Sequence, residues 1–178
     1  MKRWFGVVVI VCVTALMSCG TDISKSDRDF VGSMIPHHLV GVKLLDDAAI
    51  RTNDVRLRRL VFEMQGYHHA ETHELEAMAD EWSVAPRDVF PGYIGTADFA
   101  DLARASGVDY DVLWLNLMIR HHDGALQLAN DALQSSASSR VSEMAEATLL
   151  TQSREVLLMR RLHGLLCRTP PRPESCND

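Results

Sequence analysis

Met34-Ile35-Pro36-His37-His38 recurs 84 positions later as Met118-Ile119-Arg120-His121-His122. In a helix, a residue shares a face with those three and four positions further along, so each methionine lies on the side of the two histidines that follow it. Adjacent helical side chains diverge by about 100°, so only one histidine of each pair can point squarely inward. Imidazole is a common metal ligand, and thioether sulfur favours soft ions. The repeat predicts two related halves that share one metal site, with candidate ligands Met34, His37, His38, Met118, His121 and His122.

The segments around both copies have apolar residues at helical spacing, and none alternates like a strand. Helices are expected at about 27–50, 53–82, 109–133 and 141–166, with a short helix at about 97–105 in the long connection. Each pair of long helices forms a hairpin whose apolar stripe needs a partner. The sequence therefore predicts an all-α domain over 27–167, an up-down four-helix bundle made of two repeated helical hairpins at about 27–82 and 109–166, followed by a proline-rich tail at 168–178.

The second helix of each hairpin carries carboxylates on its expected inner face. Glu71-x2-Glu74-x3-Met78 aligns with Gln152-x2-Glu155-x3-Met159, which predicts that Glu74 and Glu155 point into the core. A buried carboxylate without a partner is costly, so each should meet a cation, a histidine or a metal ion. Two interpretations remain: a structural network of histidine–glutamate hydrogen bonds, or a metal site in which the carboxylates are ligands or orient the ligands.

A second group of possible ligands lies in the first half alone. It consists of Met64, His68, His69 and His73. His69 and His73 are four positions apart and could chelate one ion from one helix, although histidines at this spacing are also common on protein surfaces. The group has no counterpart in the second half, where the matching stretch is Thr151-Gln152-Ser153-Arg154.

The mixture of ligand types indicates the metal. Histidine with thioether sulfur suits copper, with methionine favouring Cu(I), whereas histidine with glutamate would suit zinc or another divalent ion. Catalytic motifs are incomplete: His73-Glu74-Leu75-Glu76-Ala77 lacks the second histidine of the zinc-protease motif, and the Glu-x-x-His spacing of di-iron carboxylate bundles is absent. The sequence thus names no catalytic residue, and a metal-dependent enzyme remains only an alternative.

The N-terminus has the features of a bacterial lipoprotein signal. Lys2 and Arg3 precede an apolar run at 4–17 that is too short to span a bilayer, and Leu16-Met17-Ser18-Cys19-Gly20 resembles a lipobox. We therefore expect a signal peptide at 1–18, acylation of Cys19 with palmitate or a similar chain, and a tether at 19–26. The protein would be anchored by lipid to the cell membrane on its extracytoplasmic side. The alternative is an ordinary secretory signal with Cys19 retained by chance.

Charge and cysteine use agree with export. The formal charge of −6 becomes −8 once Lys2 and Arg3 leave, and no long basic run remains, so nucleic acid is not an expected partner. Cys167 and Cys176 are nine positions apart near the end of the chain. In an oxidising compartment they would form a disulfide between the tail and the last helix; the alternative is that they are soft metal ligands.

The chain resembles a bacterial family, the domain of unknown function 305, over about 27–165. The resemblance rests on Asp29-Phe30-x3-Met34-Ile35-Pro36-His37-His38, on Gly107-x5-Leu113-x4-Met118-Ile119-x-His121-His122-x-Gly124-Ala125 and on Gln152-x2-Glu155-Val156-x2-Met159. It implies a ferritin-like four-helix fold, export and, for some members, copper binding or copper tolerance. The chain departs from the family pattern at Glu71, where the family tends to have Gln, and in its extra His68, His69 and His73.

Three hypotheses follow for function. The first is a lipid-anchored metal-binding protein that sequesters copper or hands it on, with the ion between the helices that carry the two repeats. The second is a metal-dependent enzyme of unknown reaction. The third is a structural or partner-binding lipoprotein in which the histidine and glutamate layer only specifies the fold.

Overall fold

The computed structural model describes residues 23–170 and 172–177. Over this part of the chain the secondary structure is helical, without strands, as predicted. The long helices are α1 (Lys25–Arg51), α2 (Val55–Trp82), α4 (Gly107–Ser135) and α5 (Ser139–Leu166); the shorter ones are α3 (Thr96–Arg104) and the 3₁₀ helix η1 (Glu174–Asn177). The expected signal peptide and the lipidation site at Cys19 lie outside the described residues.

Side-chain caps set where the first helices begin and end. Ser24 and Asp27 form a reciprocal capping box at the start of α1, so this helix begins at Lys25, inside the segment expected to be tether. Asp54 accepts hydrogen bonds from the backbone N–H groups of Arg56 and Leu57 and thereby caps α2. Ser83 ends α2 in a left-handed conformation with φ 53°.

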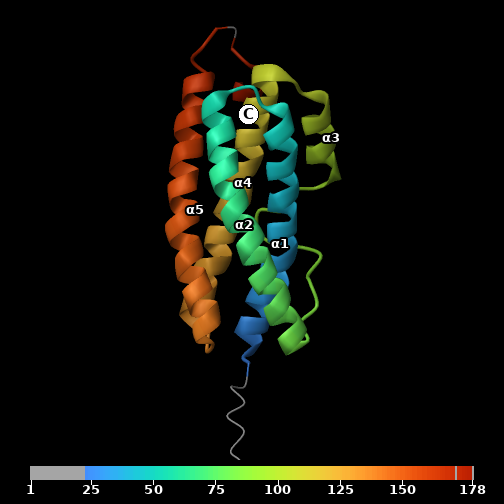
Figure 1. Cartoon of the computed structure of the whole chain (residues 1–178), viewed down its shortest axis with the longest axis vertical. Coiled ribbons are helices and arrows are strands. Elements are labelled where there is room, and N and C mark those ends of the chain that lie inside the picture. Colours follow the sequence, from blue (N-terminus) through green and yellow to red (C-terminus); the bar gives the residue numbers. More distant parts are fainter. Residues whose placement is uncertain (1–22, 171, 178) are drawn as a thin grey trace, which may run out of the picture.

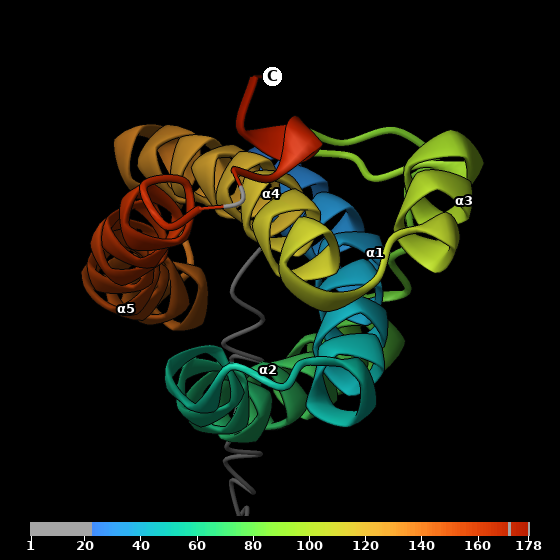
Figure 2. The ribbon, with the colours of Figure 1, turned by 90° about the horizontal axis from the view of Figure 1, so that it is seen from above.

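The four long helices form two antiparallel hairpins, α1–α2 and α4–α5 (Figure 1). The connection that includes α3 runs along the outside of the bundle and carries the chain to the end at which α1 stops, so α4 starts there and lies antiparallel to α1 (Figure 1). Along this contact Trp114 Nε1–H donates to the Leu44 carbonyl at 2.8 Å, and the Tyr110 hydroxyl donates to Asp47 at 2.9 Å. Viewed from above, α2 and α5 face each other across the remaining side of the bundle. They stand further apart than the neighbouring pairs α1–α2, α1–α4 and α4–α5 (Figure 2).

The apolar core is divided into two clusters along the bundle axis. One contains Leu44, Leu57, Trp114 and Met118 among others. The other is built around residues such as Phe30, Met34, Leu75 and Ala125. Between them lies a layer of buried polar side chains from all four long helices. The fold thus encloses a polar layer at mid-height, sealed above and below by packed apolar side chains.

The C-terminal tail is tied back onto the bundle. Cys167 and Cys176 form a disulfide. Asn116 Nδ2–H donates to the Ser175 carbonyl at 3.0 Å, and the Glu174 backbone N–H donates to Asp109 at 2.9 Å, so η1 docks on α4. Of the helices in the described segments, none combines the length and the apolar character that a membrane crossing requires.

Candidate metal centre

Five histidines make up most of the buried polar layer. None is more than about 1% exposed, and they come from α1, α2 and α4: His37, His38, His68, His121 and His122. The rings of His37 and His121 stack with their centroids 3.7 Å apart where α1 crosses α4. The His68 ring lies between those of His38 and His122, at 5.3 and 5.7 Å respectively. Both halves of the repeat therefore meet in one continuous imidazole cluster, which we call the histidine layer.

Hydrogen bonds to carbonyl groups fix the tautomers of the stacked pair. His37 Nε2–H donates to the His121 carbonyl at 2.9 Å, which leaves Nδ1 of His37 as a buried lone pair without a partner. His121 Nδ1–H donates to the Gly92 carbonyl at 3.2 Å, which leaves Nε2 of His121 likewise unpaired.

The same arrangement holds for two further histidines. His68 Nδ1–H donates to the Met64 carbonyl at 3.2 Å, and His122 Nε2–H donates to the Glu155 carboxylate at 2.9 Å. Nε2 of His68 and Nδ1 of His122 are buried without a hydrogen-bond partner. A neutral imidazole with one nitrogen oriented by an acceptor and the other bearing a free lone pair is the form that binds metal ions. Four histidines of the layer have this arrangement of one nitrogen held by an acceptor and one nitrogen without a partner.

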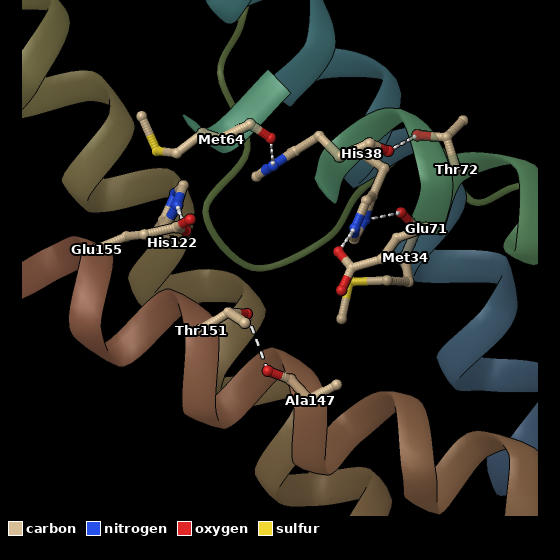
Figure 3. Close-up of polar contacts among 10 residues, drawn as sticks. Met34, His38, Met64, Glu71, Thr72, His122, Ala147, Thr151 and Glu155 are labelled. Atoms are coloured by element: carbon tan, nitrogen blue, oxygen red, sulfur yellow. Dashed lines mark hydrogen bonds and ion pairs between the residues drawn. The ribbon is translucent and has the colours of Figure 1, made fainter. Parts of the chain in front are cut away.

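His38 differs because both of its nitrogens are engaged. Nδ1 lies 3.1 Å from the Met34 carbonyl and Nε2 lies 2.9 Å from Glu71 (Figure 3). Both partners are acceptors, so neither nitrogen of His38 is free to face an ion in this conformation. It ties α1 to α2, as the His122–Glu155 pair ties α4 to α5.

Burial keeps three histidines of the layer, His37, His68 and His121, uncharged. It lowers the pKa of His37 and His68 well below the usual value, because water no longer solvates the imidazolium, and neighbouring histidines lower it further. For His121 the same burial, with the proximity of His122, lowers the pKa to about 3. At neutral pH these three side chains are neutral and keep their lone pairs.

Gly41 leaves space beside two of the free nitrogens. A Cβ at this position would lie 3.1 Å from Nε2 of His121 and 3.2 Å from Nε2 of His68. The two nitrogens, one from each hairpin, therefore converge on the space that glycine leaves open. Three methionines of the same region, Met34, Met64 and Met118, have fully buried side chains.

The donor set fits a soft ion better than a preformed zinc site. Over the described part of the chain, no group of three or more His, Cys, Asp or Glu side chains already surrounds a common metal position. Structural zinc sites are built from four such ligands, whereas Cu(I) accepts few ligands and includes thioether sulfur among them. Neutral imidazoles near buried methionines offer the few nitrogen and thioether ligands that Cu(I) accepts.

The long connection between α2 and α4 closes one side of the layer. Gly92 has φ +74°, and a Cβ on Gly124 of α4 would lie 2.3 Å from the Pro91 carbonyl oxygen, so the connection packs directly on the helix backbone. This close approach brings the Gly92 carbonyl to His121, and Phe90 packs against the His37 ring at 5.4 Å. None of these residues is among the predicted site residues; the glycines at 92 and 124 are the sequence signal that could have revealed the close contact.

The predicted inward position of Glu74 is wrong. Its side chain is 53% exposed and lies 3.5 Å from Arg140. Glu71 takes the inner position and pairs with His38. The two histidine–glutamate pairs have the same sequence separation of 33, so Glu71 corresponds to Glu155 and the repeat keeps its offset of 84 throughout. The sequence alignment of the second helices was shifted by three residues.

The predicted second cluster does not form. Met64 and His68 are buried, whereas His69 and His73 are exposed on the outer face of α2. The His73 side chain is 88% exposed and lies 3.9 Å from Glu76. With the offset of 84, His68 corresponds to Gln152, which is buried with both amide atoms unpaired. His68 therefore belongs to the histidine layer, and the two halves supply different donors at matching places.

Comparisons with known proteins agree with this architecture. The sequence profile of Domain of unknown function (DUF305) matches residues 27–163. A DUF305 protein from Streptomyces coelicolor is 21% identical, with a TM-score of 0.73 over 79% of this chain and 93% of that one. A DUF305 fragment from Deinococcus radiodurans is 25% identical, with a TM-score of 0.73 over 80% and 98% of the respective chains. CopM in its Cu(I)-bound form is 20% identical, with a TM-score of 0.68 over 78% and 96%. No curated protein sequence gives a significant match.

Proposed function

Because this chain belongs to the domain of unknown function 305 family, over whose profile most of it aligns, we propose that it is an extracytoplasmic protein that binds copper in its histidine layer. One observation carries the proposal: four buried imidazole nitrogens, at His37, His68, His121 and His122, have no hydrogen-bond partner. Buried polar groups are normally paired, because an unpaired one costs about 1–3 kcal/mol. A bound ion would offset that cost and explains why both hairpins supply such groups.

The charge of the layer favours Cu(I) as the cargo. Transfer of an ion into a buried site costs more for a divalent than for a monovalent cation, and neutral ligands leave that charge uncompensated. The carboxylates of Glu71 and Glu155 are engaged by the Nε2 atoms of His38 and His122. A single positive charge with imidazole and thioether ligands therefore suits this centre. CopM structures described as bound to Cu(I), Cu(II) and Ag support the same metal class.

We assign His68 and His121, whose free nitrogens converge beside Gly41, as the first imidazole ligands. His122 and Met64 or Met118 would move towards the ion to complete its coordination. In this assignment Glu155 orients His122, and His38 with Glu71 holds the first hairpin in place. His37 stacks against His121 and supplies a further nitrogen nearby. Sequestration of copper, or its transfer to another protein, is the role that such a buried, chemically inert set of ligands supports.

The proposed location is the outer side of the cell membrane, held by lipid on Cys19. The basic start, short apolar run and lipobox-like residues 16–20 support it. The Cys167–Cys176 disulfide fits an oxidising compartment. Replacement of Cys19 by Ser should move the protein from the membrane fraction to the soluble fraction without changing its metal affinity, whereas persistence in the membrane fraction would refute the anchor.

Competition titration of the mature domain with a Cu(I) chelator under reducing, anaerobic conditions tests the proposed function. Zn(II) and Ag(I) are titrated in parallel. We expect tight binding of Cu(I) and Ag(I), with a loss of about tenfold or more in His68→Gln and His121→Gln. Glutamine is the residue at position 152, which matches His68 in the repeat, so the bundle tolerates it in this environment.

His69→Gln is the matched control, because His69 adjoins His68 but is exposed. It should leave Cu(I) affinity unchanged. Equal affinity in His68→Gln, His121→Gln and His69→Gln would refute the buried centre. Absence of binding in the unsubstituted protein would leave the layer with a purely structural role, which is the competing hypothesis.

A further inference from the structure

The outer face of α5 carries large apolar side chains that nothing in the described chain covers. Leu150 is 78% exposed and Leu157 is 70% exposed. They are seven residues apart, so they lie two helical turns from each other on one side of the helix. Figure 2 shows α5 at the edge of the bundle, with its outer side turned away from every other helix.

Charged residues flank the two leucines in an ordered way. Glu143 and Glu146 precede Leu150, and Arg154 and Arg161 follow it; all four are exposed. Over the described residues, none of these four side chains forms an ion pair within the chain, although many other surface charges do. The outer face of α5 therefore carries Glu143 and Glu146 towards its N-terminal end, Leu150 and Leu157 on either side of Arg154 in the middle, and Arg161 towards its C-terminal end.

This order makes the face complementary to itself in antiparallel orientation. Suppose that Leu150 of one copy lies opposite Leu157 of a second, antiparallel copy. A residue that precedes Leu150 by a given number of positions then lies opposite the residue that follows Leu157 by the same number. Glu146 lies four residues before Leu150, and Arg161 lies four residues after Leu157. Glu146 therefore faces Arg161 of the second copy, and the two-fold symmetry generates the same pair twice.

We propose that two copies of the chain associate through the outer faces of α5, packed antiparallel about a two-fold axis between Ser153 and Arg154. The leucines supply apolar contacts on both sides of the axis, and the two Glu146–Arg161 pairs fix register and orientation. The two copies of Arg154 lie beside the axis, and their like charges oppose association. One helix pair buries less than the roughly 1,200 Å² typical of stable complexes, so this is a weak dimer. The arrangement leaves the histidine layer of each copy intact and does not depend on the proposed metal.

Sedimentation analysis of the mature, metal-free domain over a concentration series tests the dimer. We expect concentration-dependent dimerisation that weakens at high salt, because the ion pairs are exposed. Leu150→Glu should abolish it. Ile50→Glu is the matched control: Ile50 is 85% exposed on α1, away from the proposed interface, and its replacement should leave dimerisation unchanged.

Charge reversal tests the register. Glu146→Arg alone and Arg161→Glu alone each place two like-charge contacts in the dimer, and we expect each to weaken self-association by about tenfold or more. A mixture of the two variants should form a heterodimer as strong as the original dimer, because both contacts then join opposite charges. Circular dichroism establishes that each variant remains folded, as expected for exposed positions.

Four outcomes would overturn the proposal. One is a monomer at every concentration measured. Another is self-association that survives Leu150→Glu. The third is failure of the mixed charge variants to associate. The fourth is an effect of Leu150→Glu confined to binding of anionic phospholipid vesicles, which would assign this face to the membrane instead. Copper affinity serves as a separate measurement, so failure of the dimer leaves the proposed function intact.

Discussion

At the scale of single residues, Gly41 offers a test of the proposed metal site, because it leaves space beside the free nitrogens of His121 and His68. We predict that Gly41→Ala lowers Cu(I) affinity at least about tenfold, because its Cβ would occupy the space beside Nε2 of His121 and lie 2.9 Å from Cδ2 of His68. Chelator competition measures the affinity. We also expect a loss of stability of about 1–3 kcal/mol from overpacking.

Gly66→Ala is the control, since nothing lies within 4 Å of a Cβ there. It should raise stability by about 0.5–1 kcal/mol through the helix propensity of alanine and leave affinity unchanged. A copper affinity in Gly41→Ala equal to that of the control would show that the ion binds elsewhere.

Substitutions of Glu155 and Glu74 compare a carboxylate that orients a proposed ligand with a carboxylate on the surface. Glu155→Gln weakens the acceptor that holds His122 Nε2–H, and loss of such orienting groups typically costs 10–100-fold in metal affinity. We predict a reduction of that order for Cu(I), measured by the same competition. Glu74→Gln should have no effect, because Glu74 is exposed and lies near Arg140. The reverse result would restore the alignment that placed Glu74 inside.

At the scale of helices, the sequence predicted the elements well and their relative register less well. Periodicity and caps placed the four long helices within a few residues, because an apolar stripe and a terminal Asp or Ser are local signals. Whether Glu71 or Glu74 points inward depends on how α2 is rotated about its own axis. Two side chains three residues apart point in directions that differ by only about 60°, so the apolar pattern alone does not separate them. The spacing of 33 between His38 and Glu71, repeated at His122 and Glu155, was the signal that would have resolved it.

His68 was harder to place from sequence. It belongs to a run with His69 and His73, and side chains four apart suggest a chelating pair more readily than a buried single residue does. The buried positions Met64 and Thr72 lie four residues before and four residues after His68, so they share a face of α2 with His68 and not with His69. Burial of an imidazole depends on partners from α1 and α4, which no local pattern in α2 specifies.

The connection between the hairpins provides an element-scale prediction. Gly124→Ala places a Cβ 2.3 Å from the Pro91 carbonyl oxygen, so the connection must move away from α4 and the Gly92 carbonyl must leave His121. We expect a destabilisation of about 1–3 kcal/mol in chemical denaturation and faster amide hydrogen exchange across 84–95.

Gly164→Ala tests the same substitution on α5, where a Cβ would meet only the end of the Arg168 side chain at 4.0 Å. Its stability should stay equal or rise slightly. If both variants unfold alike, the close packing of the connection on α4 contributes nothing, and helix propensity alone governs these positions.

At the scale of the whole molecule, three buried, neutral histidines make folding sensitive to acid. The pKa of His121 falls from 6.5 to about 3 on folding, and those of His37 and His68 also fall well below 6.5. Above pH 6.5 both folded and unfolded states hold these rings neutral, so stability is unaffected. As the pH drops below 6.5, the three imidazoles bind protons in the unfolded state but not in the folded state, so the free energy of unfolding decreases.

We predict that the free energy of unfolding of the metal-free protein decreases by up to about 4 kcal/mol per pH unit between roughly pH 6 and pH 5, since each of three histidines contributes up to about 1.4 kcal/mol per unit. Urea denaturation at a series of pH values measures this slope. His121→Gln, with one buried imidazole fewer, should flatten the slope by about a third. A slope unchanged in that variant would mean that the layer admits protons while folded.

Saturation with Cu(I) should raise stability at neutral pH, and because protons compete for the same lone pairs, the gain should shrink on acidification.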